Sequence, residues 1–407
     1  MPPATSPWRH GLWVVGLVAV VWLACFRFPL VWMATGIGEA DRPFMDLHGI
    51  LAACDAARAG VDPFLPNHFD PYHRPHVYST WWLELGRLGL GRSDTLWLGT
   101  MLVIAMLVAA VLVVRPRERH EGVALFLLLT SPALLLAVNR ANNDLVVFLL
   151  VSVGLLCFRR ETWPWQAVGI VFFAVSAVLK YSPLTTLIVL LDLRSRRTLA
   201  AGLGVYAVVL ALGVPSLVEG LQSAARFNPT PIGLFAYGAP ALLRNFGLNS
   251  VPGWLLPGLL LVGWAGFLAV RRVAAPEPAG ADRTAEREFM CGAALLVGLF
   301  FLGSSYVYKL VFALWLLPWL GRLGGSAEKE GWGRATWRLL LLVAWLEGGM
   351  AVLLNVLIAR WSMPLARALL EVTPVAAQVA TWALVACLLR FVLGYVFRRA
   401  RALGVAG

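Results

Sequence analysis

Long apolar runs recur along the whole chain, and they constrain its fold more than any other feature of the sequence. They lie near residues 11–33, 95–114, 122–138, 145–158, 164–179, 183–193, 199–214, 254–270, 289–303, 310–320, 335–358 and 374–397. Several match the roughly 20 residues that a helix needs to cross the hydrocarbon core of a bilayer. The 407 residues are 59% hydrophobic and only 14% charged, which is too apolar for a soluble globular protein. The sequence therefore predicts an all-α, polytopic transmembrane helical bundle with about 10 to 13 membrane segments.

Arginine and lysine collect in every second connection between these runs. The clusters lie at residues 115–119, 159–160, 194–197, 271–287, 322–338 and 398–401. By the positive-inside rule, these connections and both termini are cytoplasmic, and residues 34–94 are extracytoplasmic. We expect a multi-pass protein of a bacterial-type plasma membrane. The net charge of +12 lies in these short clusters, so we attribute it to contacts with anionic membrane lipids and not to nucleic acid.

No soluble domain separates from the apolar runs, and we expect one membrane-embedded domain over residues 1–407. Within it, residues 34–94 form the first extracytoplasmic loop, and the polar, Gly- and Pro-containing stretches 271–288 and 321–334 are predicted cytoplasmic linkers. The runs are interrupted at Lys180–Pro183 and Ser304–Lys309. We interpret both interruptions as broken helices, whose irregular backbone must be surrounded by protein or by a wet cavity.

The first extracytoplasmic loop contains a predicted short amphipathic helix from Asp46 to Ala59, ended by Gly60. Its apolar residues share one face at helical spacing: Leu47, Ile50, Leu51 and Cys54. Asp46 lies in the first turn, where a carboxylate can cap free backbone amides, and this cap is the simplest explanation of the residue. Asp55 follows nine residues later, about 13 Å along an ideal helix and on another face, so the two acids are a poor catalytic dyad.

Metal and disulfide chemistry are not indicated. His68, His73 and His76 share the loop with Asp70 and could ligate a divalent metal, but their spacing matches no standard site and we predict none. Four of the five cysteines lie in apolar runs, and only one lies in the loop, so no disulfide framework is expected. There is no Gly-rich phosphate loop for a nucleotide cofactor.

Five motifs occur in order along residues 10–320. They are MDLHGILAACDAARAGVDPF, VYSTWWLELGRLGL, NRANNDLVVFLL, LKYSPL and SSYVYKLVFALWLLP. Each motif alone is weak, but their order, spacing and membrane face resemble glycosyltransferase family 87. These are membrane enzymes of the GT-C type that transfer sugars, typically mannose, from a polyprenyl-phosphate donor. The resemblance implies a GT-C-like fold, an inverting hexosyltransferase activity in the cell envelope, and an acceptor that is a glycan, a lipid or a protein.

The resemblance also implies roles for residues of the first loop. The family's first-loop acid, usually taken as the catalytic base, corresponds to Asp46, with Asp55 as the reserve base if the helix register differs. The family's turn after the helix corresponds to Gly60, Asp62, Pro63 and Phe64, and Asp62 is a candidate for sugar or acceptor binding. The sequence departs from the family's Tyr-Pro-Pro pattern, because Tyr78 is followed here by Ser and Thr.

The chemistry of such a transfer requires a base for the acceptor hydroxyl and cations for the departing phosphate. Arg140, Lys180 and Lys309 are the candidate phosphate ligands. Each lies at the outer end of an apolar run or at a helix break, on the predicted side of Asp46. The alternative is that each snorkels to the membrane interface, as a basic residue near a helix end can do.

Further polar residues have two interpretations each. Asn143 and Asp144 could bind sugar hydroxyls, as the resemblance implies, whereas capping of the next helix explains Asn142. Tyr306 and Tyr308 flank Lys309 and could stack on a sugar or form part of an interfacial aromatic belt.

Two charges lie inside apolar runs. We expect Arg27 and Glu347 to form a structural pair, either with each other or with Arg390.

A transporter or lipid flippase without glycosyl transfer is the alternative function, because discontinuous helices also build transport sites. A non-catalytic assembly subunit is the third hypothesis. The acids crowd one outer loop and no internal repeat is evident, which favours the enzyme. No cofactor is expected beyond the lipid-linked sugar, which is the donor substrate.

Overall fold

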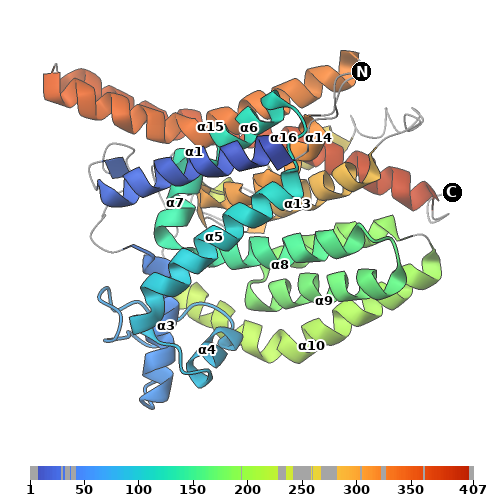
Figure 1. Ribbon diagram of the computed structural model, residues 1–407, viewed down its shortest axis with the longest axis horizontal. Helices are drawn as coiled ribbons and strands as arrows, with labels where there is room; N and C mark the ends of the chain where they lie inside the picture. Colours follow the sequence, from blue (N-terminus) through green and yellow to red (C-terminus); the bar gives the residue numbers. More distant parts are fainter. Residues whose placement is uncertain are drawn as a thin grey trace. The chain divides into compact units, whose positions relative to one another are not determined.

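The computed structural model is helical, with two short strands in its described part, as the apolar runs predict (Figure 1). It describes residues 8–28, 31–32, 37, 43–193, 195–227, 235–241, 258, 260–266, 282–302, 305–321, 327–360 and 363–402. Their contacts divide the chain into two compact units. Unit 1 comprises residues 1–41, 110–136 and 230–407, and unit 2 comprises residues 42–109 and 137–229. The predicted single membrane domain therefore consists of two such units.

Unit 2 carries the first loop and a layer of three helices. The loop contains α3 (Met45–Arg58), α4 (Glu84–Arg87) and the short 3₁₀ helices η1 (Thr80–Leu83) and η2 (Arg92–Asp94). The layer consists of α8 (Asn143–Phe158), α9 (Trp163–Leu179) and α10 (Arg196–Phe227), which lie side by side in Figure 1. The 3₁₀ helix η3 (Ser182–Asp192) joins α9 to α10. Most of α5 (Thr95–Val114) and the end of α7 (Pro132–Arg140) also belong to this unit.

Unit 1 is built on long helices around a buried core. It contains α1 (Trp8–Arg27), α6 (Arg119–Leu129), α13 (Arg283–Leu302), α14 (Leu317–Leu320), α15 (Ala327–Arg360) and α16 (Met363–Ala402). The strands β1 (Ala236–Tyr237) and β2 (Ser305–Tyr306) pair antiparallel, and β2 leads into the 3₁₀ helix η4 (Val307–Leu316). Phe289, Phe312 and Trp315 are fully buried in this core.

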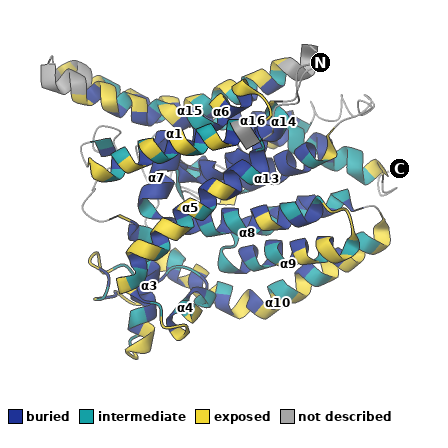
Figure 2. Cartoon of the chain, viewed as in Figure 1, coloured by how far each residue is buried: buried dark blue, intermediate teal, exposed yellow. Residues whose placement is uncertain are grey.

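Several helices have the length and composition of membrane spans. Within the described residues, five helices qualify, in the ranges His10–Arg27, Arg92–Val114, Arg196–Phe227, Gly331–Asn355 and Glu371–Ala402. The pair α6 and α7, bent by 56° at its break, gives a sixth candidate, and shorter apolar helices include α8 and α9. Figure 2 shows exposed residues along α1, α5 and α10, and among these are Leu12, Met101 and Leu212, each at least 60% exposed. Such apolar surfaces suit contact with lipid, and the protein is an all-α, multi-pass membrane protein.

Two predictions differ from the structure: parts of both predicted linkers are helical, and Glu347 does not form the predicted ion pair. Residues 283–288 of the predicted linker 271–288 begin α13, and residues 327–334 of the predicted linker 321–334 begin α15, while 271–281 and 322–326 lie outside the described residues. Glu286 is buried at α13 and accepts a hydrogen bond from Arg398 at 2.7 Å. Glu347 forms no ion pair with Arg27 or Arg390. Its Oε2 accepts from the backbone N–H of Phe235 at 2.7 Å.

Candidate functional site

Asp46 lies in the first turn of α3, where the sequence placed it. The predicted helix from Asp46 to Ala59 is confirmed as Met45–Arg58, with Leu47, Ile50, Leu51 and Cys54 buried, and Gly60 follows with a φ of 73°. Before the helix, Phe44 adopts a left-handed conformation with a φ of 67°, and its N–H donates to the carbonyl of Asn139 at 2.6 Å. This backbone bond fixes the start of α3 against the end of α7.

The carboxylate of Asp46 binds side chains from distant segments and does not cap α3. Arg140 donates to it in a two-pronged geometry, from Nε to Oδ2 at 3.0 Å and from Nη2 to Oδ1 at 2.8 Å. Asn142 adds a bond from Nδ2 to Oδ2 at 2.5 Å, and Arg74 adds a longer one from Nη1 to Oδ1 at 3.5 Å. The predicted capping role of Asp46 is therefore wrong, because two guanidinium groups and an amide are stronger partners for a carboxylate.

The surroundings keep Asp46 ionised. Burial alone would raise the pKa of its carboxyl, since only 9% of the side chain is exposed. The charge of Arg140, the hydrogen bonds from Arg140 and Asn142, and the charge of Arg74 outweigh this effect and hold the pKa below its usual value. Asp46 is thus a largely buried carboxylate that can accept hydrogen bonds at neutral pH.

Arg74 is a site residue that the sequence analysis missed. Its guanidinium donates to the carbonyl of Met45 at 2.7 Å and to both oxygens of Asp70, at 2.7 and 3.2 Å, in addition to Asp46. Burial alone would lower the pKa of Arg74, but the hydrogen bonds and charge of fully buried Asp70, with the charge of Asp46, raise it above its usual value. The only signal in the sequence is the i, i+4 spacing of Asp70 and Arg74, which is too common to single them out.

Lys180 forms a second charged cluster in unit 2. The α9 helix ends at Leu179, and Lys180 is extended before η3 begins, so the predicted break at this residue is confirmed. Its ammonium donates to Asn143 Oδ1 at 2.7 Å and to Asp144 Oδ1 at 2.8 Å. Only 11% of the Lys180 side chain is exposed, and Asp144 is fully buried. The ammonium is therefore held by polar groups of the first turn of α8.

Asn142 connects the two clusters. Its Oδ1 accepts from the N–H of Asp144 at 2.9 Å, which confirms the predicted cap of α8. The Nδ2 of the same amide donates to Asp46. The Asn142 side chain therefore caps α8, the helix that carries Asn143 and Asp144, and also orients the Asp46 carboxylate.

Tyr78 lies near both clusters. The Lys180 Nζ is 5.8 Å from the centre of its ring. Burial raises the pKa of the Tyr78 hydroxyl to about 12. The charges of Asp46 and Asp144 also raise this pKa, whereas those of Lys180 and Arg140 lower it. The hydroxyl makes no hydrogen bond with any residue that the structure describes, so its proton is available to a ligand.

Small residues of α10 hold the segment that carries Tyr78. Ser223 Oγ donates to the carbonyl of His76 at 2.6 Å, and Ser216 shares a hydrogen bond with Thr80. Between them, Gly220 faces the backbone of Tyr78, and a Cβ added there would lie 2.3 Å from the carbonyl oxygen. Ser79 and Thr80, the departures from the family pattern, therefore have structural roles, because Ser79 also accepts from the N–H of Trp81 at 3.3 Å.

The remaining candidates are placed as follows. Asp55 pairs with Arg58 at 2.5 Å and with Arg92 at 3.4 Å, apart from the contacts of Asp46. Asp62 is exposed and accepts from the N–H of Phe64 at 2.9 Å, which forms the predicted turn.

Lys309, Tyr306 and Tyr308 belong to unit 1. Lys309 is buried in η4, with its Nζ 5.4 Å from the Tyr308 ring, and the two tyrosine rings are 5.6 Å apart. The structure therefore brings Arg140 and Lys180 into the unit of Asp46 and assigns Lys309 to the other.

The histidine loop has structural contacts. The ring of buried His76 is 3.2 Å from the carbonyl of Ser79, and Asp70 is occupied by Arg74. Among the described residues, no three His, Cys, Asp or Glu side chains gather in a way that could hold a metal ion. All five cysteines are free and buried.

Comparisons with protein-family models, with curated proteins and with solved structures found no match. The function is therefore argued from the residues. A largely buried carboxylate in contact with a partly exposed arginine, near a second cation and a phenol, can accept a proton and bind an anion at adjacent positions.

Proposed function

We propose that the protein is a membrane glycosyltransferase of the GT-C type. It transfers a hexose, with mannose as the first candidate, from a polyprenyl-phosphate donor to a glycan, lipid or protein acceptor on the extracytoplasmic face. The observation that carries the proposal is the direct contact of Asp46 with Arg140, at 2.8 and 3.0 Å. The contact joins a carboxylate, which can accept a proton, to a guanidinium, which can bind phosphate. Both residues come from motifs that resemble glycosyltransferase family 87.

In this proposal, Asp46 is the base. An oxygen of its carboxylate takes the proton of the acceptor hydroxyl while the acceptor oxygen attacks the anomeric carbon of the sugar. The bond from that carbon to the phosphate oxygen breaks, and its electron pair stays on the departing lipid phosphate. Attack from the face opposite the phosphate inverts the configuration, and a single carboxylate is sufficient for this step.

Arg140 supports the departing phosphate and also controls the base. About a third of its side chain is exposed, against 9% for Asp46, so an incoming phosphate can reach the guanidinium. A phosphate bound to Arg140 offsets part of the positive charge of the guanidinium, so Arg140 then lowers the pKa of Asp46 less. Asp46 then becomes a stronger base when the donor is bound.

Lys180 is the second phosphate ligand of the proposal, and Asn143 and Asp144 contact the sugar or hold Lys180 in place. All of these residues belong to unit 2, together with Asp62. Lys309, Tyr306 and Tyr308 lie in unit 1, so the proposal rests on the residues of unit 2 alone.

The test is sugar transfer from radiolabelled polyprenyl-phosphate-mannose by the purified full chain in detergent. Asp46→Asn should lower the rate by about 100-fold or more, since a positioned base contributes about that much. Asp55→Asn is the matched comparison, because Asp55 lies on the same helix but pairs with Arg58 and Arg92. We expect it to retain transfer. Loss in Asp55→Asn with full activity in Asp46→Asn would make Asp55 the base and refute our assignment.

A lipid or solute transporter is the second candidate. It is supported by the two discontinuous segments, at Lys180 before η3 and at β2 before η4, each of which carries a lysine in or beside it. Proteoliposomes with a fluorescent polyprenyl phosphate distinguish the two functions. Movement of this lipid between leaflets, unchanged in Asp46→Asn and without any sugar transfer, would favour the transporter.

A further inference from the structure

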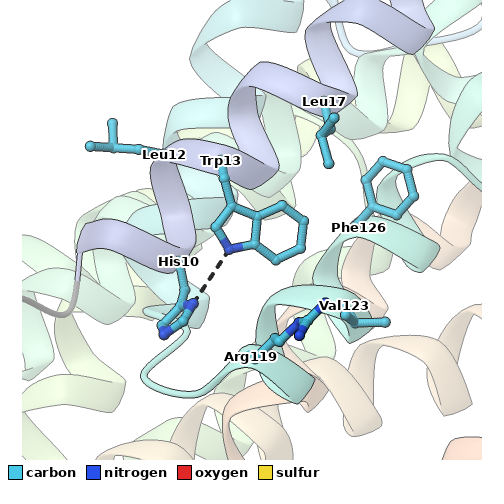
Figure 3. A pocket seen from close by; sticks show the side chains of 7 residues that line it. All are labelled: His10, Leu12, Trp13, Leu17, Arg119, Val123 and Phe126. Carbon is cyan, nitrogen blue, oxygen red and sulfur yellow. Dashed lines mark hydrogen bonds between the residues drawn. The ribbon is translucent and has the colours of Figure 1, made fainter. Parts of the chain in front are cut away.

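A cavity of about 910 Å³ lies between α1 and α6 in unit 1 (Figure 3). It is lined by His10, Leu12, Trp13, Leu17, Arg119, Val123 and Phe126. Figure 3 shows Trp13 projecting from α1 towards α6, with Leu17 and Phe126 facing each other nearby and Leu12 pointing away. Its volume is within the range of roughly 300–1,000 Å³ that is usual for small-molecule sites.

The walls of the cavity are apolar and partly open. Leu17 is 49% exposed and Val123 is 40% exposed, so the helices leave these side chains uncovered. Trp13 is seated closely on α6, because a Cβ at Gly122 would lie 2.8 Å from its indole ring. The indole Nε1 donates to His10 Nδ1 at 3.4 Å, so the two lining side chains of α1 contact each other. Because α1 qualifies as a membrane span, such an apolar surface suits an acyl chain.

The polar end of the cavity is positive. Arg119 is exposed and forms no ion pair or hydrogen bond with any described residue, and His10 is partly exposed beside it in the lining. Among the described residues, no carboxylate lines the cavity. The two acids next to Arg119 are engaged elsewhere. Glu118 lies 3.2 Å from His120, and Glu121 accepts from the N–H of Arg117 at 2.6 Å and from that of Glu118 at 3.2 Å.

We propose that this cavity binds a bilayer phospholipid with an anionic headgroup. The phosphate contacts the guanidinium of Arg119 and the ring of His10, and one acyl chain follows Trp13, Leu17 and Phe126. A basic residue at the end of an apolar groove is complementary to such a lipid in both charge and polarity. The site is independent of the proposed transfer reaction, because all its residues belong to unit 1.

The experiment is native mass spectrometry of the full chain in detergent, titrated with phosphatidylglycerol or phosphatidylcholine. The apparent dissociation constant of the first bound lipid is measured for each. We expect the wild type to bind phosphatidylglycerol more tightly than phosphatidylcholine. Arg119→Gln should weaken the binding of phosphatidylglycerol about fivefold and abolish this preference.

Two further variants separate the site from general surface charge. Arg117→Gln removes the same charge two residues away but outside the lining, and it should bind as the wild type does. Leu17→Trp fills the cavity without a change in charge, and it should weaken both lipids. Equal binding of the two lipids by the wild type, or equal loss in Arg117→Gln and Arg119→Gln, would overturn the proposal. So would competition by polyprenyl phosphate that is stronger than by phosphatidylglycerol, since the cavity would then be a donor site.

Discussion

The Lys180–Asp144 pair offers the sharpest test of the energetics of unit 2. The Lys180 Nζ lies 2.8 Å from Asp144 Oδ1 and 2.7 Å from Asn143 Oδ1, with Asp144 fully buried. Removing one partner of a buried ion pair costs about 3–5 kcal/mol. In Asp144→Asn, Asn143 still accepts from Lys180, so we expect a loss of about 3 kcal/mol in the free energy of unfolding.

Removal of Lys180 should lower the free energy of unfolding more than removal of the Asp144 charge. Lys180→Met removes the ammonium beside an Asp144 carboxylate that has no exposed surface, so we expect the free energy of unfolding to fall by about 4 kcal/mol. The double variant removes both charges together, and it should be more stable than the sum of the single losses predicts by about 2 kcal/mol or more.

These free energies are measurable by reversible unfolding of the full chain in mixed micelles with increasing amounts of SDS. The matched control is the pair Glu84–Arg87, whose side chains are 54% and 81% exposed at a separation of 2.9 Å. A pair this exposed should show little coupling. If the Lys180 and Asp144 losses add within about 0.5 kcal/mol, the two groups do not interact as the structure places them, and the reasoning fails.

Two further outcomes are expected in unit 2. Gly220→Ala should lower stability by about 1–3 kcal/mol, because its Cβ would meet the backbone of Tyr78; Gly204→Ala on the same helix meets no atom within 4 Å and should not destabilise in thermal unfolding. Burial lowers the pKa of His76 to about 4, from 6.5 when unfolded, so the unfolded chain binds the extra proton and stability should fall as the pH drops from 6.5 towards 4. His76→Gln should lose most of this pH dependence, and an unchanged profile would exclude His76 as its source.

Local signals in the sequence predicted local features well. The apolar spacing after Asp46 and the glycine at its end predicted α3 to within one residue at each end. The cap by Asn142 and the break at Lys180 also follow from short motifs, and both are confirmed. These features depend on neighbours in the chain, and a single sequence contains that information.

Contacts between distant segments were beyond a single sequence. The cap of its own helix was the simplest local explanation of Asp46, because nothing local indicates that Arg140, 94 residues away, binds it. The stretch 283–288 was predicted to be a linker for the same reason. Its charges suggest solvent, whereas Glu286 is buried and paired with Arg398, which lies 112 residues later. Polarity alone cannot distinguish a solvated segment from one whose charges are paired inside the protein.

The side-chain amide of Asn142 accepts a hydrogen bond from the N–H of Asp144 through its oxygen and donates one to Asp46 through its nitrogen. Substitutions can therefore remove one of these two bonds and retain the other. Asn142→Asp retains an oxygen for the N–H of Asp144 but replaces the donor to Asp46 with a second negative charge. Asn142→Ser retains a cap and leaves the acid without that donor and without added charge. An inactive Asn142→Ala protein would therefore be ambiguous, whereas the Ser and Asp variants distinguish a helix that starts wrongly from an acid that has lost its orientation.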